Sequence, residues 1–291
     1  MEQDIQVKDL GKELKKLWGY DEENLERNLG KFFSQLKFGS EESIILKELL
    51  KKYIYITEEK EKEYLVKFHK IIDKLDKTRT MFSYIESKDE KINSSNGILN
   101  EYKRLYKIPN NTSYKIIKLK DYVIENLILF DDISGTGSTI IDFFKKYLQI
   151  LKEKDSLKIY LLVYIISEKA HEEIIKFCGE QGINIIIKHI ILVKKCFEKG
   201  YIYYDEAYEK EKIIRKLEEE ICGDKGKEYI LGYKNSQLLV SLHRNTPNNT
   251  LSSFWYENSR WKGLFPREKM ILTKIDRKKL SNQKRKYKKE I

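Results

Sequence analysis

The stretch LILFDDISGTGSTI, residues 127–140, constrains the fold of this chain more than any other part of its sequence. An apolar run that begins at Leu127 is followed by two adjacent acids, Asp131 and Asp132, and then by a short loop of glycine and hydroxyl residues. From Ser138 the apolar residues recur at the spacing of an amphipathic helix. This order predicts a buried strand that delivers carboxylates and a polar loop to the carboxyl end of a parallel sheet, where ligands of open α/β folds bind.

The surrounding sequence alternates between apolar runs and segments with helical periodicity. The runs rich in Ile, Leu, Val and Tyr are predicted strands: Thr80–Ile85, Tyr114–Leu119, Leu127–Phe130, Leu157–Ile166 and Ile183–Val193. The predicted helices are Ile98–Tyr106, Ser138–Leu151, Ala170–Cys178 and a long charged one at Asp205–Cys222. Continuously apolar strands joined by helices indicate a parallel sheet flanked by helices, so the expected fold class is α/β.

The first 77 residues are predicted to be helical throughout, because apolar side chains recur there at helical spacing, for example at Leu10, Leu14 and Trp18. This part shows no catalytic constellation. We therefore expect three parts: an all-helical bundle or interaction region at residues 1–77, an α/β domain at 78–267 and a basic tail at 268–291.

Each part of residues 127–140 suits one group of a sugar phosphate. The acid pair can accept hydrogen bonds from vicinal hydroxyls, which a ribose offers at its 2 and 3 positions. The following loop supplies closely spaced backbone N–H groups and opens a helix, whose positive end attracts a phosphate. The loop comprises Ser134, Gly135, Thr136, Gly137, Ser138 and Thr139. The predicted ligand class is therefore a ribose 5-phosphate.

These residues resemble the signature of the type I phosphoribosyltransferases: an apolar strand, two acids, two or three variable residues, then Thr-Gly-x-Thr. The match comprises Asp131, Asp132, Thr136, Gly137 and Thr139. The resemblance implies that the two acids are catalytic and hold the ribose hydroxyls of phosphoribosyl pyrophosphate (PRPP), and that the loop holds its 5-phosphate. It implies that Mg²⁺ enters with the pyrophosphate rather than through direct protein ligands. It also implies that residues 78–267 form a phosphoribosyltransferase-like domain.

The resemblance also requires a pyrophosphate loop after the first strand, and the candidate is residues 87–96, with Lys88, Ser94 and Ser95 as its binding residues. Two departures bear on activity. Purine-salvage members often carry an acid where this chain has Gly135, so this loop supplies no general base. The connection from Leu119 to Leu127 is short, whereas type I enzymes commonly have a mobile catalytic loop there.

A second polar constellation follows a strand-like run near the end of the α/β domain. It contains Arg244, Asn245, Thr246, Asn248 and Asn249. Asn and Pro favour turns, but so many amides with an arginine also suit recognition of a base or phosphate. The segment resembles the closing part of a phosphoribosyltransferase-like branch found in bacterial anti-phage systems, including retron operons. That resemblance covers most of residues 10–267 and implies a protein or ribonucleoprotein partner from a defence operon.

Charge and composition bear on the compartment of the protein and on the partners that it binds. Residues 262–291 hold twelve Lys or Arg against three acids, a net of +9 in a chain of net charge +11. Such a tail either binds nucleic acid by counterion release or is a solvated end.

The three widely spaced cysteines suggest a reducing compartment. The first twenty residues hold no apolar signal region, and the longest apolar run, Ile159–Ile166, is far shorter than a membrane span. We therefore expect a cytoplasmic protein with no membrane partner.

Two functions remain open from the sequence, beside a weaker third, a plain RNA-binding protein, which rests on the basic tail alone. The first is an enzyme that binds PRPP or a related nucleotide with Mg²⁺ and transfers or hydrolyses its glycosyl bond, as an effector or accessory protein of anti-phage defence. The second is a catalytically inactive nucleotide sensor that binds nucleic acid or a partner protein through its helical region and basic tail.

Overall fold

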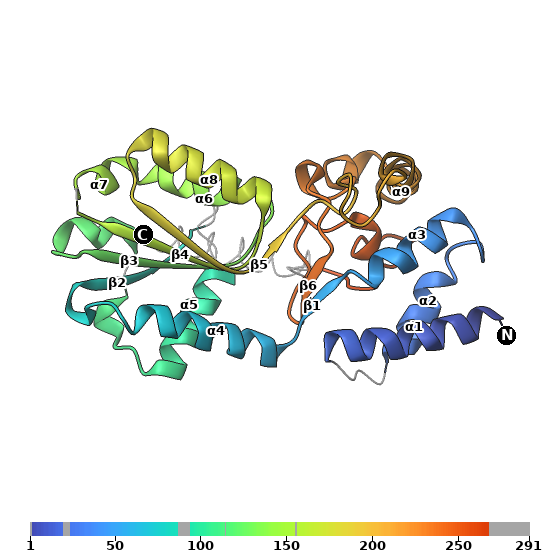
Figure 1. The fold of residues 1–291 in the computed structure, drawn as a ribbon, viewed down its shortest axis with the longest axis horizontal. Helices are drawn as coiled ribbons and strands as arrows, with labels where there is room; N and C mark the ends of the chain where they lie inside the picture. The colour runs from blue at the N-terminus through green and yellow to red at the C-terminus, as the bar shows by residue number, and fades with distance from the viewer. Residues whose placement is uncertain (1, 20–23, 87–93, 114, 155, 268–291) are drawn as a thin grey trace, which may run out of the picture.

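The computed structural model describes residues 2–19, 24–86, 94–113, 115–154 and 156–267, and its central element is a four-stranded parallel sheet (Figure 1). The strands, in spatial order, are β2 (Thr80–Tyr84), β3 (Asn126–Ser134), β4 (Lys158–Ser167) and β5 (Ile185–Val193). Each strand is parallel to its neighbours, so all carboxyl ends meet at one edge of the sheet. This confirms the predicted α/β class.

Helices cover both faces of the sheet, as its continuously apolar strands predicted. One face packs against α6 (Ser138–Lys146), α7 (Leu148–Lys152) and α8 (Glu168–Gln181). The opposite face packs against α4 (Glu58–Ile72) and α5 (Ser94–Tyr106), and Figure 1 shows the two helical layers on either side. Side chains of β4 alternate between the two layers: Leu161 contributes to the first apolar cluster and Leu162 to the second.

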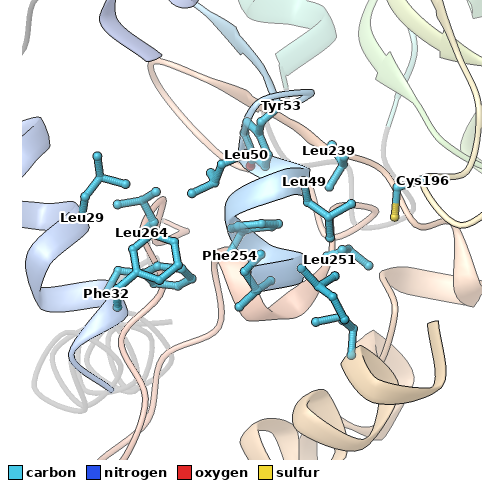
Figure 2. Close-up of a cluster of buried hydrophobic side chains, with 14 of the residues drawn as sticks. Leu29, Phe32, Leu49, Leu50, Tyr53, Cys196, Leu239, Leu251, Phe254 and Leu264 are labelled. Carbon is cyan, nitrogen blue, oxygen red and sulfur yellow. The ribbon is translucent and has the colours of Figure 1, made fainter. Parts of the chain in front are cut away.

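A second module is formed by residues from both ends of the described chain. It combines α1 (Glu2–Trp18), α2 (Leu25–Phe33) and α3 (Glu41–Leu50) with α9 (Ala207–Cys222) and residues 231–265. We call it the terminal module. Figure 2 shows its centre, where Phe254 of the C-terminal segment lies among side chains of α2 and α3. The Phe254 ring stacks on Phe32 at 5.9 Å between centroids and meets Tyr53 edge-on at 5.1 Å.

Two expectations about secondary structure are wrong. The region before residue 77 is not helical throughout, because β1 (Ile54–Ile56) pairs in parallel with β6 (Val240–Leu242). This contact joins segments far apart in sequence and has no local signal. The predicted strand Tyr114–Leu119 is instead a 3-10 helix over Ile116–Asp121. Its buried Ile116 and Leu119 are three residues apart and so lie on one side of a 3-10 turn, and so short an apolar run does not distinguish the two structures.

Packing divides the chain differently from a boundary after residue 77. Helix α4 lies before that boundary, yet its buried side chains Leu65 and Phe68 belong to the apolar cluster of the sheet. Helices α1 to α3 instead pack against residues that follow the sheet. The basic tail at 268–291 lies outside the described residues.

Short 3-10 helices complete the fold. They are η1 (Lys77–Arg79), η2 (Asn110–Thr112), η3 (Ile116–Asp121), η4 (Asp224–Tyr229), η5 (Tyr233–Asn235) and η6 (Ser252–Phe254). Within the part of the chain that the structure describes, no helix combines the length and apolar character that crossing a membrane requires.

Candidate functional site

The turn between β3 and α6 brings a row of backbone N–H groups to the carboxyl edge of the sheet. Gly137 occupies the position before the helix with φ = +70°, a left-handed conformation that glycine adopts without strain. A Cβ there would lie 3.1 Å from the Ala170 carbonyl oxygen and from the Ile174 side chain. The left-handed backbone angle therefore favours glycine at this position, and the close approach of α8 leaves little room for a side chain.

Ser167, the N-cap residue of α8, holds the loop before Gly137 in place. Its Oγ donates to the Gly135 carbonyl at 2.8 Å and accepts from the Ala170 N–H at 2.9 Å. Ser167 thus holds the loop through a carbonyl oxygen and uses none of the loop N–H groups. In the described part of the chain, none of the successive backbone N–H groups from Gly135 to Thr139 has a hydrogen-bond acceptor. Together with the positive end of the α6 dipole, they form an anion-binding turn.

Asp131 and Asp132 lie beside this turn, near the end of β3. Asp132 is held in place: one carboxylate oxygen accepts from the Ile133 N–H at 2.8 Å and from Ser94 Oγ at 2.9 Å. Asp131 accepts from the Asp132 N–H at 3.1 Å. Burial raises the pKa of the Asp131 carboxyl well above its ordinary value, and the negative charge of Asp132 raises it further.

These groups line one pocket with a volume of about 260 Å³. The first wall, which we call the strand wall, consists of Asp131, Asp132 and residues 133–139. The other wall, which we call the terminal wall, comes from the C-terminal segment. Its lining residues are Leu242, Asn245, Pro247, Asn248, Asn249 and Arg267. The structure thus brings the two polar constellations of the sequence to a single pocket.

The two walls meet where Asn249 covers Gly135. A Cβ on Gly135 would lie 2.4 Å from Asn249 Cγ, so no larger residue fits here without displacing that side chain. Asn249 is itself positioned by Ser236, whose Oγ accepts from Asn249 Nδ2 at 3.2 Å and donates to the Asn249 carbonyl at 2.8 Å. The side chain beside Gly135 is therefore an amide from a distant segment.

An ionic bridge ties the acid pair to both flanking segments. Arg244 donates to both carboxylate oxygens of Glu61 on α4 and to Asp132 Oδ2 at 3.3 Å. Burial raises the pKa of Glu61 to about 7; the charge of Arg244 opposes this rise and that of Asp132 adds to it. Burial and the neighbouring Arg244 lower the pKa of His243. Arg244 thus links α4, β3 and the C-terminal segment.

The remaining predicted site residues have different surroundings. Ser94 lines the pocket, whereas Ser95 is buried and donates to the Phe130 carbonyl while accepting from the Ile85 N–H. Thr246 is also buried, and its Oγ1 donates to the Phe265 carbonyl at 2.8 Å. Ser95 and Thr246 therefore support the backbone and do not line the pocket. Lys88 lies outside the described residues.

Sequence reasoning missed Glu61 and Arg267 as site residues. Glu61 falls on the buried stripe of α4, with Leu65, Phe68 and Ile72 at the following helical spacings, and an acid in an apolar stripe is a usable signal. Arg267 ends the apolar run Leu264–Pro266, and only the folding of this segment back onto the sheet edge brings it to the pocket.

The donor set of the pocket is compatible with a magnesium ion that is carried mainly by a ligand. The described residues contain no group of three or more His, Cys, Asp or Glu side chains that would hold a metal by themselves. The two carboxylates of the strand wall are nonetheless hard oxygen donors, and Mg²⁺ is commonly bound by one or two carboxylates together with substrate phosphates.

A family model provides the comparison with known proteins. The model of the PRTase-CE family matches residues 29–267, from within α2 to the last residue of the terminal wall. No curated protein matches the chain significantly. The match includes both walls of the pocket and the whole four-stranded sheet, and it leaves out α1 and the first residues of α2 in the terminal module.

Proposed function

This chain belongs to the PRTase-CE family and is a phosphoribosyltransferase-like protein, and from that premise we propose that its pocket binds PRPP or a related ribose phosphate together with Mg²⁺. The observation that carries the proposal is the row of backbone N–H groups from Gly135 to Thr139, which have no acceptor in the described chain and adjoin two carboxylates. An anion and a diol are the two ligand groups that this arrangement suits best.

The 5-phosphate is assigned to the turn. Its oxygens accept from the N–H groups of Gly135–Thr139, and the α6 dipole adds favourable electrostatics. The hydroxyls of Thr136 and Ser138, which lie 2.8 Å apart, provide further donors at the same place. Because Gly135 and Gly137 lack side chains, a phosphate can approach the backbone closely.

The ribose is assigned to Asp131 and Asp132, which accept hydrogen bonds from its vicinal hydroxyls. Asp131 has a raised pKa because burial leaves its negative charge poorly solvated. Hydroxyl donors from a ribose would stabilise that charge. When the bond between the anomeric carbon and its leaving group breaks, positive charge develops on the ribose, and the two neighbouring carboxylates stabilise it electrostatically.

The pyrophosphate is assigned to the side of the pocket where α5 begins, at Ser94. When bound, Mg²⁺ would neutralise charge on the departing pyrophosphate. Ser94 Oγ and the Asp132 carboxylate hold each other at 2.9 Å, so the start of α5 and the ribose site keep a fixed relation. Lys88 remains a sequence-based candidate for the same role.

In the enzyme hypothesis an acceptor then attacks the anomeric carbon and pyrophosphate leaves. Gly135 provides no general base, so a base-activating group would come from the acceptor or from the terminal wall. The resemblance of residues 244–267 to the anti-phage branch supports a role as an effector or accessory protein of a retron-like defence system. In that setting, consumption or modification of a nucleotide would halt the infected cell.

A nucleotide sensor without turnover is the second candidate, and one contact favours it. Arg244 donates a hydrogen bond to Asp132 Oδ2, on the carboxylate that the enzyme hypothesis assigns to the ribose hydroxyls. A ligand that competes with Arg244 would loosen the bridge to Glu61 on α4. The structural change caused by ligand binding would thereby be transmitted through α4 to the surface of the molecule, where a protein or nucleic-acid partner could respond.

The test is calorimetric titration of PRPP and ribose 5-phosphate, with Mg²⁺, into the wild type and the Asp131→Asn/Asp132→Asn variant. Because two charge-assisted hydrogen bonds are lost, we expect affinity to fall by at least about 100-fold. Asp121→Asn, an exposed acid of η3, is the matched control and should bind as the wild type does. Equal affinity of the double variant and the wild type would refute the site.

A further inference from the structure

Arg267 gives the pocket a positive charge on its terminal wall. Among the described residues that line the pocket, no other side chain is basic. The guanidinium lies 5.2 Å from the centre of the Trp255 ring. That ring is buried and fixed by its Nε1, which donates to the Thr250 carbonyl at 2.9 Å. The contact is a cation–π interaction on a rigid support.

The backbone that leads to Arg267 is also fixed. The Phe265 N–H donates to the Phe254 carbonyl at 2.8 Å, and the Gly263 N–H donates to the Tyr256 carbonyl at 3.1 Å. The segment therefore follows η6 closely before it reaches the pocket. Arg267 is placed there by the packing of the terminal module.

Arg244 and Arg267 differ in how their charges are balanced. Arg244 has two acidic partners, Glu61 and Asp132. Arg267 is half-buried, yet within the described ranges it has neither a hydrogen bond nor an ion pair with an acid. Burial accordingly lowers the pKa of its guanidinium. A cation that is partly removed from water without a counter-ion is costly, and an anionic ligand group would offset that cost.

The 5-phosphate already has its own binding groups at Gly135–Thr139. We propose that Arg267, with the Asn248 amide of the same wall, binds a second anionic group, so that the pocket selects a ribose 5-phosphate carrying a further acidic group. This inference rests on the proposed function. The second anion has two chemical sources: the diphosphate of the donor, which Arg267 would then bind together with the Ser94 side of the pocket, or an acidic substituent on the base of an acceptor or nucleotide.

Two pairs of probes separate these sources. PRPP differs from ribose 5-phosphate by its diphosphate, and orotidine 5′-monophosphate differs from uridine 5′-monophosphate by a carboxylate on the base. All four are titrated, with Mg²⁺, into the wild type, Arg267→Gln, Arg267→Lys and the control Arg260→Gln. Arg260 is an exposed arginine of the same segment. Thermal unfolding of each variant reports whether the fold is kept.

We expect Arg267→Gln to lower the affinity for PRPP or for orotidine 5′-monophosphate by about tenfold or more, which is the loss expected for one charge-assisted hydrogen bond. Ribose 5-phosphate and uridine 5′-monophosphate should change by less than about twofold, since they lack the second anion. A loss of affinity for PRPP assigns Arg267 to the diphosphate, and a loss of affinity for orotidine 5′-monophosphate assigns it to an acidic base. Arg267→Lys should retain part of the preference, because it keeps the charge.

Two results overturn the inference. One is unchanged affinity of Arg267→Gln for both doubly anionic probes. The other is an equal loss for ribose 5-phosphate, which would place Arg267 at the 5-phosphate. Failure of the wild type to bind ribose 5-phosphate or PRPP would instead refute the proposed function itself, so the two failures are distinguishable.

Discussion

The strand wall of the pocket comes from one continuous stretch of sequence, whereas the terminal wall is held in place by packing between both ends of the described chain. The strand wall needs only β3, its turn and α6, supported by Ser167 at the start of α8. The terminal wall depends on the terminal module, in which Phe254 contacts Phe32 and Tyr53. The comparison teaches that the proposed phosphate and ribose chemistry is encoded locally, while any selectivity from the terminal wall depends on long-range packing.

The largest effect is expected from breaking the terminal module at its centre. Phe254 is fully buried, so Phe254→Ala should lower the free energy of unfolding by about 3–5 kcal/mol. Denaturant unfolding measures this loss. Under conditions where the variant stays folded, affinity for ribose 5-phosphate should fall less than affinity for PRPP or an acidic nucleotide. An equal fall for all ligands would mean that the two walls do not act separately.

A smaller effect is expected where the two walls touch. Gly135→Ala places a methyl group 2.4 Å from Asn249 Cγ and should lower the free energy of unfolding by about 1–3 kcal/mol through overpacking. Thermal or denaturant unfolding measures the loss. Adding Asn249→Gly to the same chain should recover much of it, because the obstructing side chain is removed. If the double variant is no more stable than Gly135→Ala, the contact is not what limits residue 135 to glycine.

The smallest effect concerns the ionic bridge of Arg244 to Glu61 on α4 and to Asp132 of the strand wall. Burial raises the pKa of Glu61 to about 7 in the folded protein, whereas the ordinary pKa of a glutamate carboxyl is about 4.5. Between these values the folded state binds more protons, so its contribution to stability is present at low pH and is lost as pH rises. We expect the free energy of unfolding of the wild type, relative to Glu61→Gln, to fall by up to about 2 kcal/mol from near pH 5 to near pH 8.

Denaturant unfolding of both proteins across this pH range gives the difference directly. Lys60→Gln, on the same helix, is a control that should follow the wild-type profile. Parallel profiles for the wild type and Glu61→Gln would show that Glu61 titrates as an ordinary carboxyl and that the bridge through Arg244 does not couple to protonation.

How far the sequence predicted each wall follows from the same comparison. Asp131, Asp132 and the loop at 134–139 could be predicted to lie together because strand, acids, glycines and helix follow one another in one short stretch, and the structure places them in one pocket. The role of Thr246 was not predictable, because its partner Phe265 approaches only after the segment has folded. Arg267 was missed for the same reason. Asn245, Asn248 and Asn249 were predicted as a polar cluster, but their placement in the same pocket as Asp131 depends on contacts that sequence spacing does not encode.

The most direct test of the central claim is phosphorus NMR of PRPP and Mg²⁺ with the wild type, beside the Asp131→Asn/Asp132→Asn variant. The account predicts that the wild type shifts or broadens the 5-phosphate resonance and that the double variant does not. Release of pyrophosphate by the wild type alone would add that the pocket is catalytic, and broadening without release would favour the sensor. A PRPP spectrum that the wild type leaves unchanged, or that both proteins alter equally, would contradict the assignment of this pocket to a ribose 5-phosphate.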